Sequence, residues 1–401
     1  MGMQFVAVLN HESPALYQRW LRDNLPTNLI TLVSPKHERT IQEIHSVANL
    51  TITTIVVPTH PTDPRIGEIK AELGITPDTT ITLPAFFKED PAKFIERGTL
   101  PKIQDDYNGF RLLWHLGFRQ FETYNFQGTR AYHIPHLLDE FVDIHKNQRA
   151  FIVGNGPSLN QIDMSKLAGE ITYGSNRSYL GYDKWQYHFT YWGIVDRLQI
   201  EHYQFEYEDN VPVDIVKFFP FQYLPLLNFD NACPVPHKYG TKPGQPQFSL
   251  SPDMLYLGWS VSFFLIQIAA IMGCNPIILV GMDHNYSLDQ RKMGMIDGNR
   301  WYDRNTFTRN LINRMQRLNQ KPSKPHTPQM WKASDASGAT HFDERYTQGE
   351  GKLFVPPRPV YAEQAYAHAR KVTETHGIQI LNATPGSKLT EFEPVDFNSL
   401  F

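Results

Sequence analysis

The sequence predicts an α/β protein: a Rossmann-like parallel sheet with helices on both faces and a long lid insertion, preceded by a smaller α/β domain. Short runs of β-branched residues alternate with segments of helical spacing along much of the chain. In addition, the apolar run 150–153 leads directly into a glycine turn, as strands do in βα units. A chain of 401 residues is long enough for two domains, and we expect them over residues 1–147 and 148–401.

The N-terminal domain is predicted from buried strand patterns separated by helical ones. Nothing in it predicts a catalytic role, although His11 and His60 each follow a strand, where loop histidines are commonly without function. The strands are expected at 5–9, 29–33 and 51–57, with further ones at 80–83 and 121–126, and the helices at 14–22 and 39–48.

The C-terminal domain is predicted from the same alternation, interrupted by a polar, irregular stretch over about 285–359. Long insertions of this kind are usually lids or binding loops, and only 306–318 has a helical pattern there. The strands are expected at 150–153, 171–173, 189–191, 277–280 and 378–381, and the helices at 157–167, 260–272 and 362–375.

Composition excludes several classes of protein. A formal charge of −3 gives no electrostatic reason to expect nucleic acid or an anionic membrane as a partner. The apolar stretch 261–272 is too short to span a bilayer, and the first residues do not form a signal peptide. Cys233 and Cys274 have no metal-site spacing and are expected to be ordinary thiols. We therefore expect a cytoplasmic protein without a transmembrane segment.

The glycine turn after the strand at 150–153 is the most informative segment. Gly154 and Gly156 allow a sharp turn and close approach of a ligand, and Pro157 suits the first turn of a helix. The N–H groups around Asn155 and Ser158 would then favour a phosphate. The motif is neither a P-loop nor a dinucleotide fingerprint, and a plain tight βα turn is the structural alternative.

Further polar residues follow other predicted strands and should gather at the same edge of the sheet. Asn176 could hydrogen-bond a ribose or base, and Arg177 could pair with phosphate; their structural alternatives are a turn residue and a surface charge. Asp196 could hold Mg²⁺, accept ribose hydroxyls or cap the next helix. Asp283 and His284 are delivered at the end of the strand 277–280.

Two more candidates lie outside those strand ends. Ser260 and Ser262 open a buried helix, where they could bind an anion or simply cap the helix. His341 stands beside Asp343 in the expected lid, and its imidazole suits general acid or base chemistry, although a loop histidine often has no such role.

These motifs, in this order, resemble the MptE-like family over about residues 148–396: the turn at 154–159, Asn176, Asp196 and the Gly-Met-Asp at 281–283. That family includes 6-hydroxymethylpterin diphosphokinases and Maf-type flagellin glycosyltransferases. The same order is similar to that of bacterial sialyltransferases, whose chains open with the same glycine turn.

The resemblance implies a nucleotide-binding transferase. In the sialyltransferase-like relatives the turn and the residue at Asn176 hold a cytidine nucleotide, Ser260 and Ser262 lie near its phosphate, and a lid histidine, here His341, is the general base. The expected reaction is glycosyl transfer from a CMP-activated nonulosonic sugar to a glycan or protein acceptor, with no required cofactor. Tyr286, Tyr302 or Tyr346 would steady the leaving phosphate.

Two alternatives stay open. A diphosphokinase would transfer pyrophosphate from ATP to a pterin acceptor, with Mg²⁺ on Asp196 and Asp283 and an aromatic slot from Trp185, Trp192 or Trp259. A non-catalytic module would bind the nucleotide or sugar without turnover.

Overall fold

The computed structural model describes residues 3–9, 13–24, 26, 28–48, 52–84, 100–125, 128–224, 227, 229–238, 246–285, 295–296, 330–332, 341–347, 353–354 and 359–401. These residues divide into two units, one within Met1–Pro135 and the other within His136–Asn313 and Lys324–Phe401. The division falls before residue 147 because residues 136–147 pack on the second unit: the His145 N–H donates to the Met272 carbonyl, and its ring bonds the Tyr191 hydroxyl.

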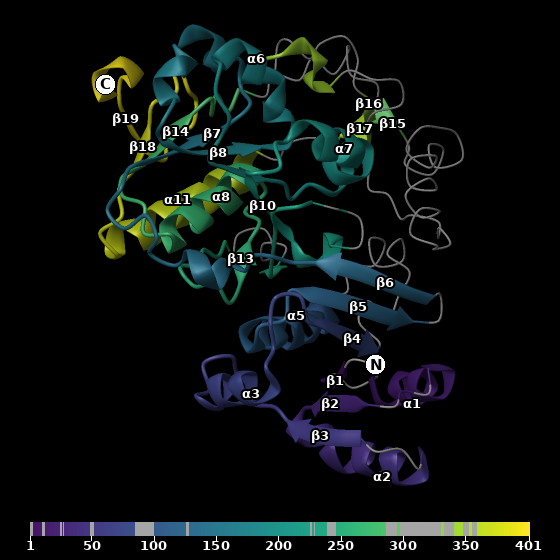
Figure 1. Ribbon diagram of the computed structural model, residues 1–401. Coiled ribbons are helices and arrows are strands. Elements are labelled where there is room, and N and C mark those ends of the chain that lie inside the picture. Colours follow the sequence, from purple (N-terminus) through teal and green to yellow (C-terminus); the bar gives the residue numbers. More distant parts are fainter. Residues whose placement is uncertain are drawn as a thin grey trace. The chain divides into compact units, whose positions relative to one another are not determined.

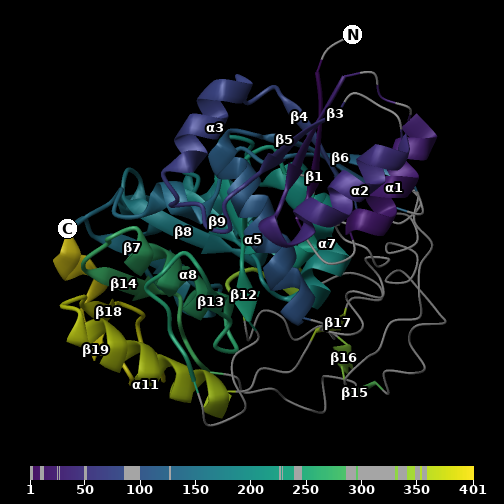
Figure 2. The ribbon, with the colours of Figure 1, turned by 90° about the horizontal axis from the view of Figure 1, so that it is seen from below.

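The N-terminal unit is a doubly wound sheet in the order β3-β2-β1-β4-β5-β6. Its strands are parallel except for β6, which pairs antiparallel with β5. Helices α1 and α2 lie on one face and α3 and α5 on the other (Figures 1 and 2). The strands are Gln4–Val8 (β1), Leu29–Val33 (β2), Ile52–Val56 (β3), Thr80–Pro84 (β4), Gln120–Asn125 (β5) and Gly128–His133 (β6). The helices are Ser13–Asn24 (α1), Glu38–Ala48 (α2), Arg65–Leu73 (α3) and Leu100–Leu116 (α5).

The described part of the C-terminal unit is built on an all-parallel sheet in the order β11-β10-β9-β8-β7-β14-β18-β19. The predicted Rossmann-like fold class is therefore confirmed. Its strands are Ala150–Val153 (β7), Ile171–Ser175 (β8), Tyr191–Gly193 (β9), Val216–Pro220 (β10), Ala232–Val235 (β11), Ile277–Val280 (β14), Ile380–Asn382 (β18) and Glu393–Pro394 (β19).

Helices α8 (Val261–Ile271) and α11 (Pro359–Thr375) lie together against one face of this sheet (Figure 1). Every described side chain of α8 from Ser262 to Ile271 is buried, which explains its uninterrupted apolar sequence. The other side of the sheet carries α6 (Tyr182–Trp185; Figure 1), and α7 (Arg197–Asn210) connects β9 to β10. Cys233 and Cys274 are buried free thiols, as expected.

The expected helix over 157–167 is wrong. The chain instead forms two short 3₁₀ segments, η3 (Pro157–Gln161) and η4 (Met164–Leu167). Asp163 separates them because its carboxylate accepts hydrogen bonds from the N–H and hydroxyl of Ser165, which starts a new turn.

The segment 285–359, which was expected to form a lid, contributes few described residues. They form a small antiparallel sheet of Met295–Ile296 (β15), Met330–Lys332 (β16) and Leu353–Phe354 (β17), and a 3₁₀ segment, η8 (Glu344–Thr347). The expected helix at 306–318, together with His11, Tyr286 and Tyr302, lies outside the described residues. Within the described part of the chain, none of the helices has the length and apolar character needed to cross a bilayer.

Candidate functional site at the β7/β14 switch point

The strand order of the C-terminal sheet changes direction between β7 and β14. Strands β8 to β11 are added successively on one side of β7, and β14, β18 and β19 follow on its other side. Open α/β sheets bind ligands at the carboxyl ends of the strands beside such a switch point. The glycine turn follows β7 and the Gly-Met-Asp segment follows β14, so both predicted motifs meet there.

The two turns are bonded directly to each other. The N–H groups of Gly154 and Gly156 donate to the carbonyls of Val280 and Gly281, at 2.8 and 3.0 Å. The Asp283 carboxylate accepts from both the N–H and the hydroxyl of Ser158, at 3.1 and 2.6 Å. Asp283 thus occupies the anion position at the start of η3 that the sequence suggested for a phosphate.

The glycines are required by this close contact between the turns. A Cβ added to Gly154 would lie 2.4 Å from the Gly281 carbonyl oxygen, and one added to Gly156 would lie 1.8 Å from the Asp283 carboxylate. The segment 281–283 of the same chain therefore approaches these glycines closely, where the sequence suggested that a ligand would. The N–H groups of residues 154, 156 and 158 are all engaged, and a phosphate would reach them only after displacing protein acceptors.

Two carboxamide oxygens remain at the neighbouring strand ends. Asn155 donates from Nδ2 to Ser175, but its Oδ1 is buried without a hydrogen bond among the described residues. Oδ1 of Asn176 is also buried without a hydrogen bond among the described residues. Asn176 has left-handed backbone angles, with φ of 49°. Buried acceptors without donors are uncommon, because each costs about 1–3 kcal/mol. The site therefore has two acceptors for hydroxyl or amino donors of a ligand.

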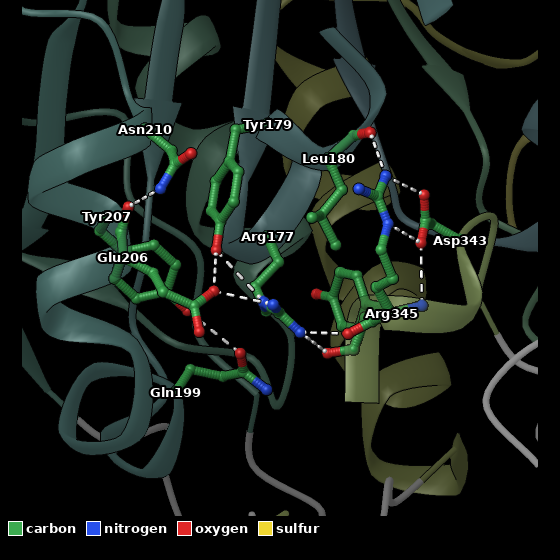
Figure 3. A network of polar contacts seen from close by, with 10 residues as sticks. Arg177, Tyr179, Leu180, Gln199, Glu206, Tyr207, Asn210, Asp343 and Arg345 are labelled. Carbon is green, nitrogen blue, oxygen red and sulfur yellow. Dashed lines mark hydrogen bonds and ion pairs between the residues drawn. The ribbon is translucent and has the colours of Figure 1, made fainter. Parts of the chain in front are cut away.

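Arg177 does not point its guanidinium at a ligand. Figure 3 shows the group enclosed by protein acceptors, with its Nη2 2.7 Å from Glu206 and its Nε 3.2 Å from the Tyr179 hydroxyl. Nη1 donates to the carbonyl oxygens of Arg345 and Tyr346. Arg177 therefore links η8 to α7, and the structure assigns it to holding the segment that carries His341.

Asp196 and Asp283 are kept apart by the sheet. Asp196 caps α7 by accepting from the Gln199 N–H at 2.9 Å, while Asp283 bonds Ser158. Their strands, β9 and β14, are separated by β8 and β7, which corresponds to about 14 Å at the usual spacing of strands. Because oxygen ligands of Mg²⁺ lie about 2.1 Å from the ion, these two carboxylates do not share one ion in this arrangement.

Ser260 and Ser262 stand at the start of α8 in the capping arrangement. The Ser260 hydroxyl accepts from the Ser262 N–H at 3.2 Å and from the Tyr366 hydroxyl at 2.9 Å. Ser260 therefore caps α8, which is the structural alternative that the sequence left open. Ser262 is buried.

Backbone hydrogen bonds of the neighbouring residue Phe342 bring His341 to the site. The N–H of the next residue, Phe342, donates to the Asn155 carbonyl at 3.0 Å, and Asn160 donates to the Phe342 carbonyl at 2.8 Å. The imidazole stacks on the Tyr346 ring with centroids 3.9 Å apart. Burial and the nearby Arg177 guanidinium lower the pKa of His341 to about 3, so the ring is neutral at physiological pH.

This low pKa predicts acid sensitivity of the C-terminal unit. Burial also lowers the pKa of His237 to about 3. Between pH 6.5 and 3 these two histidines bind protons in the unfolded state but not in the folded state. The free energy of unfolding therefore has its full value above pH 6.5 and decreases as the pH falls through this range. At pH 5 each histidine should lower the free energy of unfolding by about 2 kcal/mol relative to neutral pH. Urea unfolding at neutral pH and at about pH 5 measures this loss. His341→Gln should remove about half of it; an unchanged pH dependence would contradict the assignment.

Sequence reasoning missed the partners that position these residues. The His284 imidazole, whose side chain is 5% exposed, bonds the Glu363 carboxylate at 3.0 Å. His284 was visible as a strand-end residue, but no local pattern marked Glu363 on α11, nor Glu206 and Tyr179 around Arg177. Tyr346 is buried against His341.

The fold and the site define a doubly wound α/β unit with polar residues gathered at its switch point. No protein-family model and no curated protein matches the chain. A solved structure of a MAf glycosyltransferase from Magnetospirillum magneticum AMB-1 is 11% identical, with a TM-score of 0.35. The match covers 100% of this chain, which spans 58% of the length of that one. So distant a likeness supports no conclusion about activity.

Proposed function

We propose that the C-terminal unit binds a nucleotide-activated sugar at the β7/β14 switch point and transfers its glycosyl group to an acceptor hydroxyl. The observation that carries this proposal is the meeting of two buried carboxamide oxygens, on Asn155 and Asn176, with a neutral imidazole on His341 at one sheet edge. The donor is proposed to be a CMP-activated nonulosonic sugar, in line with the resemblance to the MptE-like and sialyltransferase families.

The carboxamides suit the nucleoside part of such a donor. Ribose hydroxyls and the exocyclic amine of cytosine are hydrogen-bond donors, which the free oxygens of Asn155 and Asn176 lack. Because Asp283 already holds the Ser158 N–H, the phosphate is proposed to lie away from this carboxylate, which would repel it. In this proposal the turn at 154–156 positions the nucleoside rather than the phosphate.

His341 is proposed to accept the proton of the acceptor hydroxyl. The acceptor oxygen forms a bond to the anomeric carbon, the bond from that carbon to the phosphate oxygen breaks, and CMP leaves with the electron pair. An imidazole with a pKa near 3 is a weak base, but an anionic donor beside it would stabilise the imidazolium and raise the pKa. Donor binding would thereby bring His341 into the range of an effective general base.

A thermal-shift experiment tests the donor. CMP should raise the melting temperature by several degrees at concentrations well above its dissociation constant, and ATP with Mg²⁺ should not. Asn176→Ala should lose this shift, because it removes the buried acceptor. His341→Ala should keep the shift but lose roughly 10²–10⁴-fold of donor turnover.

The other outcomes identify the alternatives. A shift with ATP and Mg²⁺ but not with CMP would favour pyrophosphoryl transfer, which would then need metal ligands other than a pair of Asp196 and Asp283. Binding of CMP with no turnover of the CMP-sugar, in wild type and His341→Ala alike, would favour a non-catalytic module.

A further inference from the structure

The side chain of Asn155 is fixed at the junction of two neighbouring strand ends. Asn155 lies just beyond β7, and its Nδ2 donates to the carbonyl oxygen and the hydroxyl of Ser175, at 3.3 and 3.1 Å. Ser175 is the last residue of the neighbouring strand β8 and is buried. The main chain of Asn155 is held as well, because its carbonyl accepts from the Phe342 N–H and because Gly154 and Gly156 bond the turn after β14.

These contacts allow one orientation of the Asn155 carboxamide. A backbone carbonyl oxygen accepts hydrogen bonds and donates none, so the group that faces the Ser175 carbonyl must be the NH₂ of the amide. Turning the amide over would set Oδ1 against that carbonyl oxygen, with repulsion in place of a hydrogen bond. Oδ1 is therefore fixed on the other side, where it is buried without a hydrogen bond among the described residues. To a ligand, Asn155 presents an acceptor and not a donor.

The carboxamide of Asn176 is held less strictly. It bonds the Tyr346 hydroxyl, and a tyrosine hydroxyl can donate a hydrogen bond as well as accept one. Either end of the Asn176 amide could therefore bond that hydroxyl, which leaves the opposite end for a ligand. Of the two carboxamides at this edge, it is thus Asn155 that can distinguish a ligand group that donates from one that accepts.

We propose that Asn155 selects nucleotides whose base carries an exocyclic amine. The amines of cytosine and adenine can donate to its Oδ1, whereas the carbonyl oxygens at the same ring positions of uracil and hypoxanthine would meet it as a second acceptor. Because Oδ1 is buried, water would not supply the missing donor, so the mismatched base is rejected. The inference rests on the proposed function in placing a nucleotide at this edge, and it favours a cytidine donor over a uridine donor.

Isothermal titration calorimetry with two matched pairs of nucleotides, CMP with UMP and AMP with IMP, tests the selection. In the wild type the amino nucleotide of at least one pair should bind roughly tenfold more tightly than its carbonyl partner, or better. Asn155→Ala should reduce this ratio to about threefold or less by weakening the amino nucleotide. The affinity for UMP or IMP, which makes no bond to Oδ1, shows whether the site of this variant is intact. Asn176→Ala should weaken both members of a pair by a similar factor and keep the ratio.

Asn210→Ala is the matched control. Nδ2 of Asn210 also donates to a backbone carbonyl, that of Glu206 at 2.8 Å, but the residue is exposed at the end of α7. Its replacement should change neither the affinities nor their ratio.

Three results would overturn the inference: equal binding within both pairs, tighter binding of UMP or IMP, or a ratio that Asn155→Ala leaves unchanged. Equal binding of CMP and UMP would refute the selection alone and leave the proposed nucleotide site standing. A preference for AMP over IMP that depends on Asn155, without binding of CMP, would refute the proposed CMP donor and leave the selection standing. Binding of none of the four nucleotides would overturn both.

Discussion

Replacing Arg177 by alanine should lower the free energy of unfolding of the C-terminal unit by about 3–5 kcal/mol. The Arg177 side chain is 8% exposed, and its guanidinium bonds Glu206 and Tyr179 together with two backbone carbonyls of η8. Removing it takes the donor from the two carbonyls, and leaves Glu206, which is 39% exposed, with the Tyr179 hydroxyl as its remaining donor among these groups. Urea unfolding measures the loss, and hydrogen exchange should show residues 341–347 opening more readily.

Two further variants make this prediction specific. Arg177→Lys keeps the charge but cannot reproduce the planar fork, so it should recover only part of the stability. Arg345→Ala, whose side chain is 57% exposed and pairs with Asp343, should cost no more than about 1 kcal/mol. If Arg177→Ala were as stable as wild type but lost the CMP shift, Arg177 would be a nucleotide ligand and its structural role would be refuted.

Gly154→Ala should destabilise the C-terminal unit by about 3 kcal/mol or more and abolish nucleotide binding. The new methyl group would lie 2.4 Å from the carbonyl oxygen of Gly281 and 2.8 Å from Sδ of Met282. The first contact is with backbone, which cannot turn aside as a flexible side chain can. Relief requires the turns after β7 and β14 to separate, which breaks the bond from Gly154 to Val280.

The matched control is Gly67→Ala in α3. A Cβ there meets no atom within 4 Å, so alanine should stabilise the N-terminal unit by about 0.5–1 kcal/mol through its better helix propensity. Thermal melts compare the melting temperatures of Gly154→Ala and Gly67→Ala with that of wild type. A melting temperature for Gly154→Ala equal to that of wild type would mean that the two turns are not in the close contact described above.

Strands with uniform apolar patterns were predicted well. Residues 29–33, 150–153 and 277–280 form β2, β7 and β14 with the expected bounds, because a short run of apolar and β-branched residues is typical of a strand buried on both faces of a parallel sheet. β10 and β11 were not predicted. Lys217 interrupts the pattern of β10, and its buried ammonium donates to the carbonyls of Pro212, Val213 and Ile215. Pro234 weakened the pattern of β11, where proline is tolerated at the edge of the sheet.

The sequence by itself determined that this protein is a doubly wound α/β chain and that polar residues follow its strands, because hydrophobic period and turn chemistry are local properties. Only the tertiary structure decided what those polar residues contact. Ser158 meets Asp283 and Arg177 meets the carbonyls of η8, partners more than a hundred residues away in the chain. The turn that looked open to an anion already holds a carboxylate of its own chain, because the strands that deliver Ser158 and Asp283 become neighbours only when the sheet assembles.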